Sequence, residues 1–188
     1  MTTLENREIE VKFLEVDKNA LIEKLNALHA VDLGEELITE QIFHDAKGEW
    51  PKDTKFGRIR KTKNGYFFAY KHSQQRTATG VLEIEFKIEE PAKLKAFLEE
   101  LGLVMDRENE KYRHKFKFND VVVDIDTWPK VPTYVEIEGP SEESIKVAAK
   151  DLSFDYSKGV FGTASEVIEE VYKIPVKNLR YFTFERVE

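Results

Sequence analysis

The feature that most constrains the fold is an alternation of charged and apolar side chains that recurs along the sequence. Residues 8–13 read Glu-Ile-Glu-Val-Lys-Phe, and residues 81–88 read Val-Leu-Glu-Ile-Glu-Phe-Lys-Ile. Successive side chains of a β-strand point to opposite faces, so each segment predicts a strand with one charged and one apolar face. A single strand of this kind is typical of a half-buried sheet with a solvated face. The repeated Glu-x-Glu-x-Lys order favours a second interpretation, in which the charged faces line one site.

The remaining elements are predicted from periodicity and turn signals. Strands are expected over residues 33–45, 56–63, 66–72, 111–119, 121–126 and 133–139. Asn64-Gly65 predicts a hairpin between two of them, because a type I′ turn needs positive φ at both central residues. Apolar residues at helical spacing predict helices around residues 21–28, 94–101, 142–152 and 163–172. In the second of these, Leu94, Phe97, Leu98 and Leu101 are expected to pack against the outside of the sheet.

Length and composition indicate one domain with a core of useful size. The chain has 188 residues, of which 41% are hydrophobic. We expect residues 1–174 to form this domain and residues 175–188 to be a C-terminal extension, an added strand or hairpin. The polar segment 73–80 is expected to be a mobile loop.

Charge and cysteine content narrow the classes of function. The sequence has no cysteine, which excludes disulfides and thiolate metal sites and fits a reducing compartment. Its net charge of −7 disfavours duplex nucleic acid as the main partner. No signal-peptide pattern opens the sequence and no apolar run has membrane-spanning length, so a cytoplasmic protein without a membrane partner is expected.

The charged faces could form a binding site if the sheet closes into a barrel, because the charged side chains would then line the lumen of the barrel. The acidic set is Glu8, Glu10, Glu83, Glu85, Asp124, Asp126, Glu136 and Glu138, and the basic set is Lys12, Arg58, Arg60, Lys71, Arg113 and Lys115. Carboxylates bind Mg²⁺ or Mn²⁺, whereas guanidinium and ammonium groups bind phosphate oxygens. The two sets together predict a site for a metal and a polyphosphate.

At this point the chain resembles the CYTH domain, or triphosphate tunnel metalloenzyme, family. The opening signature of that family is similar to Glu8, Glu10 and Lys12. Its later motifs are similar to Gly57-Arg58-Ile59-Arg60 followed by Lys71, and to Ile125-Asp126 through Glu136-Ile137-Glu138. The resemblance implies an α+β fold, a closed antiparallel eight-stranded β-barrel (a tunnel) with helices packed on the outside.

The resemblance also implies roles for individual residues. Metal ligands would be Glu8, Glu10, Glu83, Asp126, Glu136 and Glu138, holding Mg²⁺ or Mn²⁺. Substrate phosphates would be bound by Lys12, Arg58, Arg60, Lys71, Arg113 and Lys115. Lys12, Glu85 and Asp126 would be catalytic. The sequence departs from the family pattern at Gln41, Val81 and Pro132, with Arg76 as a substitute for the arginine expected near Val81.

Three functions stay open at this stage. The first is hydrolysis of a triphosphate compound such as inorganic triphosphate, thiamine triphosphate or ATP. The second is a class IV adenylyl cyclase, in which Phe43, Trp50 and Tyr66 could stack on the base. The third is a polyphosphate or nucleotide sensor without turnover, which the number of carboxylates disfavours, because buried acids need a metal to offset them. A homodimer is left open as well.

Overall fold

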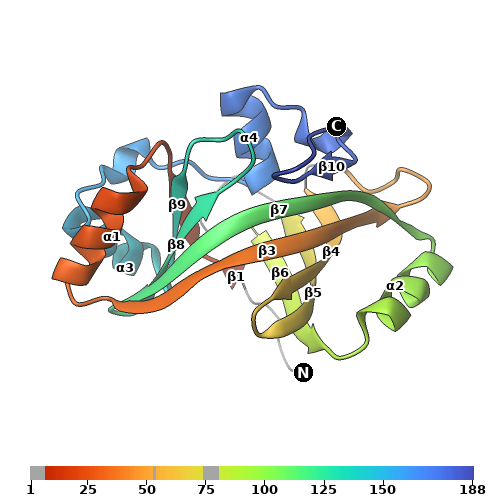
Figure 1. Ribbon diagram of the computed structural model, residues 1–188, viewed down its shortest axis with the longest axis horizontal. Coiled ribbons are helices and arrows are strands. Elements are labelled where there is room, and N and C mark those ends of the chain that lie inside the picture. The colour runs from red at the N-terminus through yellow and green to blue at the C-terminus, as the bar shows by residue number, and fades with distance from the viewer. Residues whose placement is uncertain (1–6, 53, 74–80) are drawn as a thin grey trace.

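The computed structural model describes residues 7–52, 54–73 and 81–188 of the chain (Figure 1). Its first half comprises β1 (Arg7–Glu8), β2 (Glu10–Phe13), α1 (Lys18–Ala27), β3 (Val31–Asp45), β4 (Lys55–Thr62), β5 (Gly65–Ser73) and β6 (Val81–Ile88). Its second half comprises α2 (Pro91–Glu100), β7 (Leu103–Phe118), β8 (Val121–Thr127), β9 (Tyr134–Glu138), α3 (Glu142–Asp151), α4 (Ala164–Tyr172) and β10 (Tyr181–Phe182). Short 3-10 helices cover Tyr156–Lys158 and Val176–Asn178.

The strands of the described residues form one sheet in the order β1-β6-β5-β4-β3-β7-β8-β9-β2, with β10 added in parallel beside β7. All other pairings are antiparallel. Eight strands remain when β1 and β2 are counted as parts of one strand and the two-residue β10 is set aside. The long neighbours β3 and β7 run across the molecule and curl the sheet (Figure 1).

The sheet is a curled half-barrel that stays open, so the predicted closed barrel is wrong. Its two ends approach each other through the first strand, which splits at Ile9. Arg7 and Glu8 pair with Leu82 and Val81, and the residues after Ile9 pair with β9 instead. Closure needs two strands that are hydrogen-bonded along their length. Within the described part of the chain, this two-residue pairing leaves most of the β6 edge without a neighbouring strand.

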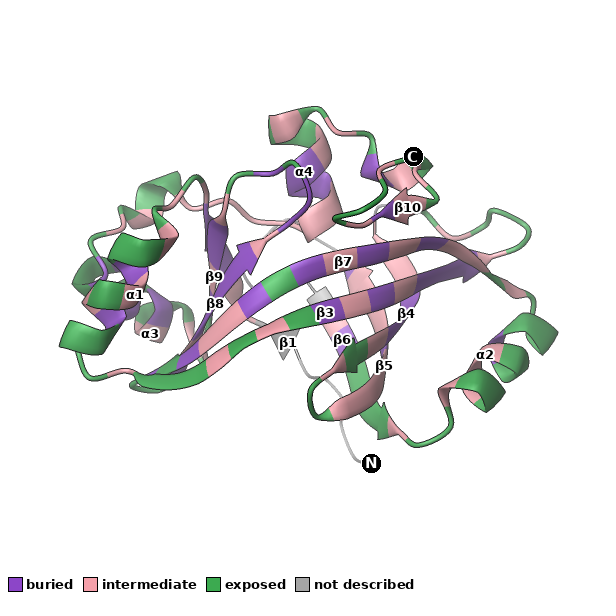
Figure 2. Cartoon of the chain, viewed as in Figure 1, coloured by how far each residue is buried: buried purple, intermediate pink, exposed green. Residues whose placement is uncertain are grey.

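The main core lies between the sheet and the helices α1 and α3, which cover one end of it (Figure 1). Val11 and Phe13 of β2 are buried there against Leu25 of α1 and Ile145 of α3. The alternation of β2 therefore directs its apolar side chains to this core and its charged side chains to the opposite, concave face. Figure 2 shows the buried strands facing these helices, whose outer sides are exposed.

Helix α2 contributes less to the core than its apolar residues predicted. Leu98 is buried, and Leu94 packs beside it against Phe43 and Ile59. Phe97 and Leu101, by contrast, are 57% and 63% exposed, so the prediction that they pack against the sheet is wrong. Leu94 and Leu98 are four residues apart and share one helix face, which is the face that meets the sheet.

The C-terminal segment packs over the opposite side of β7 from α2. Phe182 of β10 is fully buried in an apolar cluster with Trp128, Tyr134, Ile168 of α4 and Val176. A further bridge joins Phe182 to Val187, which folds the chain end back on itself. The polar loop predicted at 73–80 lies outside the described residues apart from Ser73, as does Arg76.

Candidate functional site

The concave face of the sheet encloses a cavity of about 500 Å³ that extends from the first strand to the N-terminus of α4. Among the described residues, its basic lining side chains are Lys12, Arg58, Arg60, Lys71, Arg107, Lys111, Arg113 and Lys115. Its acidic lining side chains are Glu10, Glu40, Glu83, Glu85, Asp124, Glu136 and Glu138. The volume is typical of a site for a small molecule. Although the chain carries a net charge of −7, these eight basic and seven acidic groups make the cavity slightly positive.

Most of the residues predicted for the site are brought together here. All six predicted phosphate-binding residues line the cavity, as do Glu10, Glu83, Glu85, Glu136 and Glu138. Asp126 does not: it is fully buried behind the lining. The side chain of Glu8 lies outside what the structure describes.

Six polar residues of the cavity were missed from the sequence: Glu40, Arg107, Asn109, Lys111, Thr163 and Ser165. Arg107, Asn109 and Lys111 extend the alternation of Arg113 and Lys115 toward the start of β7, which begins at Leu103 rather than at residue 111. The register of β3 and β7 also shifts between Ile42 and Phe43, which leaves Asp106 as an extra residue. Such a bulge re-aims the side chains beside it and is not visible in a simple alternation.

The first of two buried ion-pair networks is centred on Arg58. Its guanidinium donates to Glu40 at 3.1 Å and to Glu83 at 3.1 Å. Glu83 also accepts an ion pair from Lys71 at 2.8 Å, and Arg60 donates to Glu85 at 2.6 Å. Burial by itself would raise the pKa of Glu40, but the charges of Arg58, Lys111, Arg60 and Arg113 together outweigh it and lower that pKa to about 2. The network holds the two arginines extended along the cavity wall.

The second network is centred on Arg113. It binds both oxygens of Asp126 at 2.6 Å, Asp124 at 2.5 Å and Glu136 at 2.6 Å. Lys111 donates to Asp126 at 2.8 Å. Burial opposes the charged form of Arg113, yet the three carboxylates raise its pKa well above the ordinary value. Asp126 therefore orients two cations toward the cavity, and both of its oxygens are occupied by them.

Two acidic residues, Glu10 and Glu138, lie opposite each other where β2 pairs with β9. Lys12 lies 2.7 Å from Glu10 and 3.4 Å from Glu136. Burial and then the charges of Glu10 and Asp124 raise the pKa of Glu138. Burial would also raise the pKa of Glu136, but Lys12 and Arg113 lower it well below its ordinary value. The charges of Lys71 and Lys115 offset only part of this effect, so the pKa of Glu138 stays raised.

The donors at this end fit a hard divalent cation. Carboxylate oxygens are the ligands that Mg²⁺ and Mn²⁺ prefer, and two acids that face each other gain from a cation between them. No group of three or more such side chains among the described residues is already gathered around one point.

The opposite end of the cavity is closed by α4. Thr163, Ala164 and Ser165 line it there, and Ser165 accepts a hydrogen bond from Arg107 at 3.1 Å. Thr163 begins the helix with a capping box, in which its hydroxyl accepts the N–H of Glu166 while the Glu166 carboxylate accepts the N–H of Thr163. The helix start is therefore fixed beside Arg107.

A comparison with family models decides the family. The model of the CYTH domain matches residues 6–166, which is most of the chain and contains every described residue that lines the cavity. The chain belongs to the CYTH domain family. A comparison with curated proteins gives no match for it.

Solved structures share the fold of this CYTH protein. A Pyrococcus horikoshii protein is 24% identical with a TM-score of 0.68, covering 81% of this chain and 93% of that one. A candidate adenylate cyclase from Vibrio parahaemolyticus is 12% identical with a TM-score of 0.73, covering 88% and 99%. A Hippeastrum protein, a candidate adenylyl cyclase described as having a dominant triphosphatase activity, is 17% identical with a TM-score of 0.62, covering 86% and 94%. At these identities the likeness establishes the fold alone.

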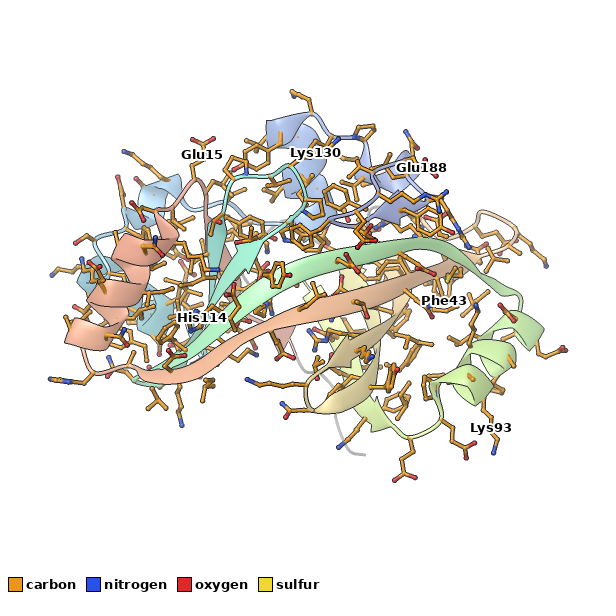
Figure 3. The ribbon with its side chains drawn as sticks, in the orientation of Figure 1. Glu15, Phe43, Lys93, His114, Lys130 and Glu188 are labelled. Carbon is orange, nitrogen blue, oxygen red and sulfur yellow. The ribbon has the colours of Figure 1, made fainter. Side chains whose placement is uncertain are left out.

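The aromatic residues considered for base stacking lie away from the CYTH cavity. Phe43 is fully buried at the end of the sheet near α2, where Figure 3 labels it. Trp50 packs edge-on against Tyr70, and Tyr66 lines a separate groove under α2. In the described part of the chain, the aromatic side chains that line the cavity are Phe56 and Trp128.

No helix among the described residues is long and apolar enough to cross a bilayer.

Proposed function

We propose that this CYTH protein is a divalent-metal-dependent triphosphatase that hydrolyses the terminal phosphoanhydride bond of a triphosphate compound. The observation that carries the proposal is the arrangement of Arg58, Arg60, Lys71 and Arg113 around one cavity, each held by a carboxylate: buried ones for Arg58, Lys71 and Arg113, and the partly exposed Glu85 for Arg60. Cations fixed in this way are ready to bind phosphate oxygens without reorganising, which is the main source of catalysis in phosphoryl transfer. The triphosphatase activity of the Hippeastrum protein supports the same reading.

We assign two functions to two groups of cavity residues: basic side chains bind the phosphates, and acidic side chains bind the metal. Arg58, Arg60, Lys71 and Arg113 donate hydrogen bonds to the phosphate oxygens, and Lys12 reaches the same anion from the first strand. We assign Glu10 and Glu138, with Glu8 and Glu136, to Mg²⁺ or Mn²⁺. When bound, the cation supplies positive charge that offsets the triphosphate at the carboxylate end.

Hydrolysis requires a water molecule whose oxygen bonds to the terminal phosphorus while the bond from that phosphorus to the bridging oxygen breaks. The attacked phosphoryl group becomes orthophosphate, the rest of the substrate leaves as the diphosphate with the bridging oxygen, and the proton of the water passes to solvent. We assign Glu85 to orient this water, since its side chain is 31% exposed while it still holds Arg60. Asp126 takes a role other than the predicted ones of metal ligand and catalytic group. Because its oxygens bind Lys111 and Arg113, it positions those two cations.

Cyclisation of ATP is the alternative, and relatives of similar fold are candidate adenylate cyclases. A cyclase has to hold the ribose and base so that the 3′ hydroxyl reaches the α-phosphorus. Phe43, Trp50 and Tyr66 do not line the cavity, and Trp128 lies at its closed end, which leaves Phe56 as the aromatic side chain for a base. Terminal hydrolysis needs no base contact, so it is the activity we favour.

Product analysis tests the proposal. The protein is incubated with inorganic triphosphate, thiamine triphosphate or ATP, each with Mg²⁺, with Mn²⁺ or with EDTA, and the products are separated. We expect orthophosphate, metal dependence and little discrimination by the organic group. Cyclic AMP and pyrophosphate from ATP, without orthophosphate, would establish the cyclase instead. Tight binding of triphosphate without any product would establish a sensor.

A further inference from the structure

The C-terminal residues 175–188 lie beyond the part of the chain that matches the CYTH model, yet they form the wall behind the closed end of the cavity. Their apolar cluster contains Trp128 and, packed against it, Ala164 of α4. Both of these residues also line the cavity. The tail is therefore separated from the site by a single layer of side chains.

An aromatic stack connects the tail to that layer. The rings of Phe182 and Trp128 are stacked with centroids 6.0 Å apart and an interplanar angle of 19°. The polar edge of the Trp128 ring is also held, because the indole N–H donates a hydrogen bond to the hydroxyl of the buried Tyr134 at 2.8 Å. Phe182, with no exposed surface, thus sets the position of the indole plane.

The indole in turn contacts a cation of the site. Lys111 Nζ lies 4.9 Å from the centroid of the Trp128 ring and 2.8 Å from Asp126 Oδ2. A cation over an aromatic face is attracted by the ring, and more strongly where water is excluded. Lys111 is only 4% exposed. Its place in the cavity is therefore determined by Asp126 on one side and by Trp128 on the other.

The tail also fixes the backbone of β7 at the residues whose side chains enter the cavity. Tyr181 and Phe182 pair with Glu108 and Asn109, and the carbonyl of Arg180 accepts the N–H of Glu108 at 2.9 Å. The Arg180 guanidinium donates to the carbonyl of Asp106 at 3.1 Å. These contacts flank Arg107, which lines the cavity.

We propose that the C-terminal tail is a positioning element of the anion site, in which Phe182 acts through Trp128 on Lys111. The inference rests on the proposed function to the extent that the anion is a triphosphate. It adds that Lys111 is a substrate-binding residue and that its placement depends on a segment outside the matched domain. Truncating the Phe182 ring should allow the indole to tilt and Lys111 to leave its place over it.

Binding of inorganic triphosphate, measured by calorimetry with Mg²⁺ present, tests the coupling. Phe182→Leu should raise the Kd by about tenfold, with a rise in KM that exceeds the fall in kcat. The matched control is Phe184→Leu, since Phe184 belongs to the same tail but is 41% exposed and contacts Tyr112 outside the cavity. It should leave the Kd unchanged. If Phe182→Leu does not fold, Phe182→Met provides a flexible apolar replacement of similar volume.

Two further measurements separate positioning from general destabilisation. In a Lys111→Met background, Phe182→Leu should have no additional effect on the Kd, because the residue through which it acts is gone. In a Trp50→Phe background Trp128 is the one remaining tryptophan of the sequence, and its emission should change on triphosphate binding. That change should be lost in Phe182→Leu.

The outcomes distinguish this inference from the proposed function. An unchanged Kd in folded Phe182→Leu, or equal effects of that substitution with and without Lys111, would overturn the inference and leave the triphosphatase proposal intact. Binding of triphosphate without turnover by the unsubstituted protein would overturn the triphosphatase proposal. The Kd values of the unsubstituted protein and of the Phe182 and Lys111 variants would still test the effect of the tail on anion binding. A parent protein that does not bind triphosphate would overturn both.

Discussion

Glu10 and Glu138 face each other directly across the β2–β9 pairing, with like charges on the same face of the sheet. Opposed like charges destabilise a strand pair unless a cation lies between them. Lys12 lies 2.7 Å from Glu10 and 3.4 Å from Glu136, whereas Lys71 and Lys115 offset the raised pKa of Glu138 only in part. The pair is therefore where metal dependence and stability should be linked.

Glu138→Gln should abolish metal-dependent turnover while the metal-free protein keeps or gains thermal stability. The substitution removes a charged ligand with little change in volume, and it removes the repulsion from Glu10. Melting temperatures with and without Mg²⁺ measure both effects, and Glu23→Gln on the exposed side of α1 is the control. A large loss of stability without metal would contradict the assignment.

The pH dependence of the metal-free protein should follow the raised pKa of Glu138. A carboxyl group whose pKa is higher in the folded state favours folding when it is protonated. Its contribution is complete below the unfolded pKa of about 4.3 and is lost as the pH rises through the folded pKa. Mg²⁺ competes with this proton, so its affinity should rise over the same interval. Glu138→Gln should flatten both profiles in denaturation and calorimetric measurements.

Glu40 should behave in the opposite way, because its folded pKa is lowered to about 2. Its contribution to stability is present above the unfolded pKa of about 4.3 and is lost as the pH falls toward the folded value, with an upper bound of roughly 3 kcal/mol. Glu40→Gln should therefore lower the free energy of unfolding at pH 7 and have a smaller effect near pH 2. Urea denaturation across this range measures it, with the exposed Glu99→Gln as control. Equal losses at pH 7 and pH 2 would contradict the pairing with Arg58.

Removal of Arg113 should be more damaging to the fold than removal of any exposed cation of the site. Arg113→Met would leave Asp124, Asp126 and Glu136 without their shared partner, at a cost of about 3–5 kcal/mol. Arg113→Lys keeps the charge but not the planar fork, so it should lose less stability while triphosphate binding is still weakened. Chemical denaturation measures the difference. Lys115→Met is the comparison, since Lys115 is 43% exposed and its loss should cost under about 1 kcal/mol.

Arg60→Ala should weaken triphosphate binding by about 1.5–3 kcal/mol, the range for a hydrogen bond to a charged group. Arg60 lines the cavity and is held by Glu85, so its loss removes a donor that was already in place. Trp50→Ala should have little effect, because Trp50 packs against Tyr70 and lies outside the cavity lining. Isothermal calorimetry measures both. A reversed order, with Trp50→Ala the more damaging, would favour a nucleotide base pocket and the cyclase.

The sequence by itself determined the strands and which face of each is charged. In β2, the alternation from Glu10 to Phe13 places Val11 and Phe13 in the core and Lys12 in the cavity. The hairpin of β4 and β5 forms in its predicted place, but its turn differs from the predicted one: Thr62 pairs with Gly65, so the turn residues are Lys63 and Asn64, and of Asn64 and Gly65 it is Gly65 that has positive φ. These features depend on a two-residue period and on local turn chemistry, both of which can be read from neighbouring residues.

Tertiary structure decided what depends on strands that are distant in the sequence. The half-barrel stays open because β1 pairs with β6 over two residues before the chain turns to β9. Arg107 enters the cavity because β7 begins at Leu103 and the alternation of Arg113 extends back along it, and Asp126 lies behind the lining because Lys111 and Arg113 cover it. Alternation assigns a side chain to a face of a strand. Its depth on that face is set by the partners that long-range packing brings to it.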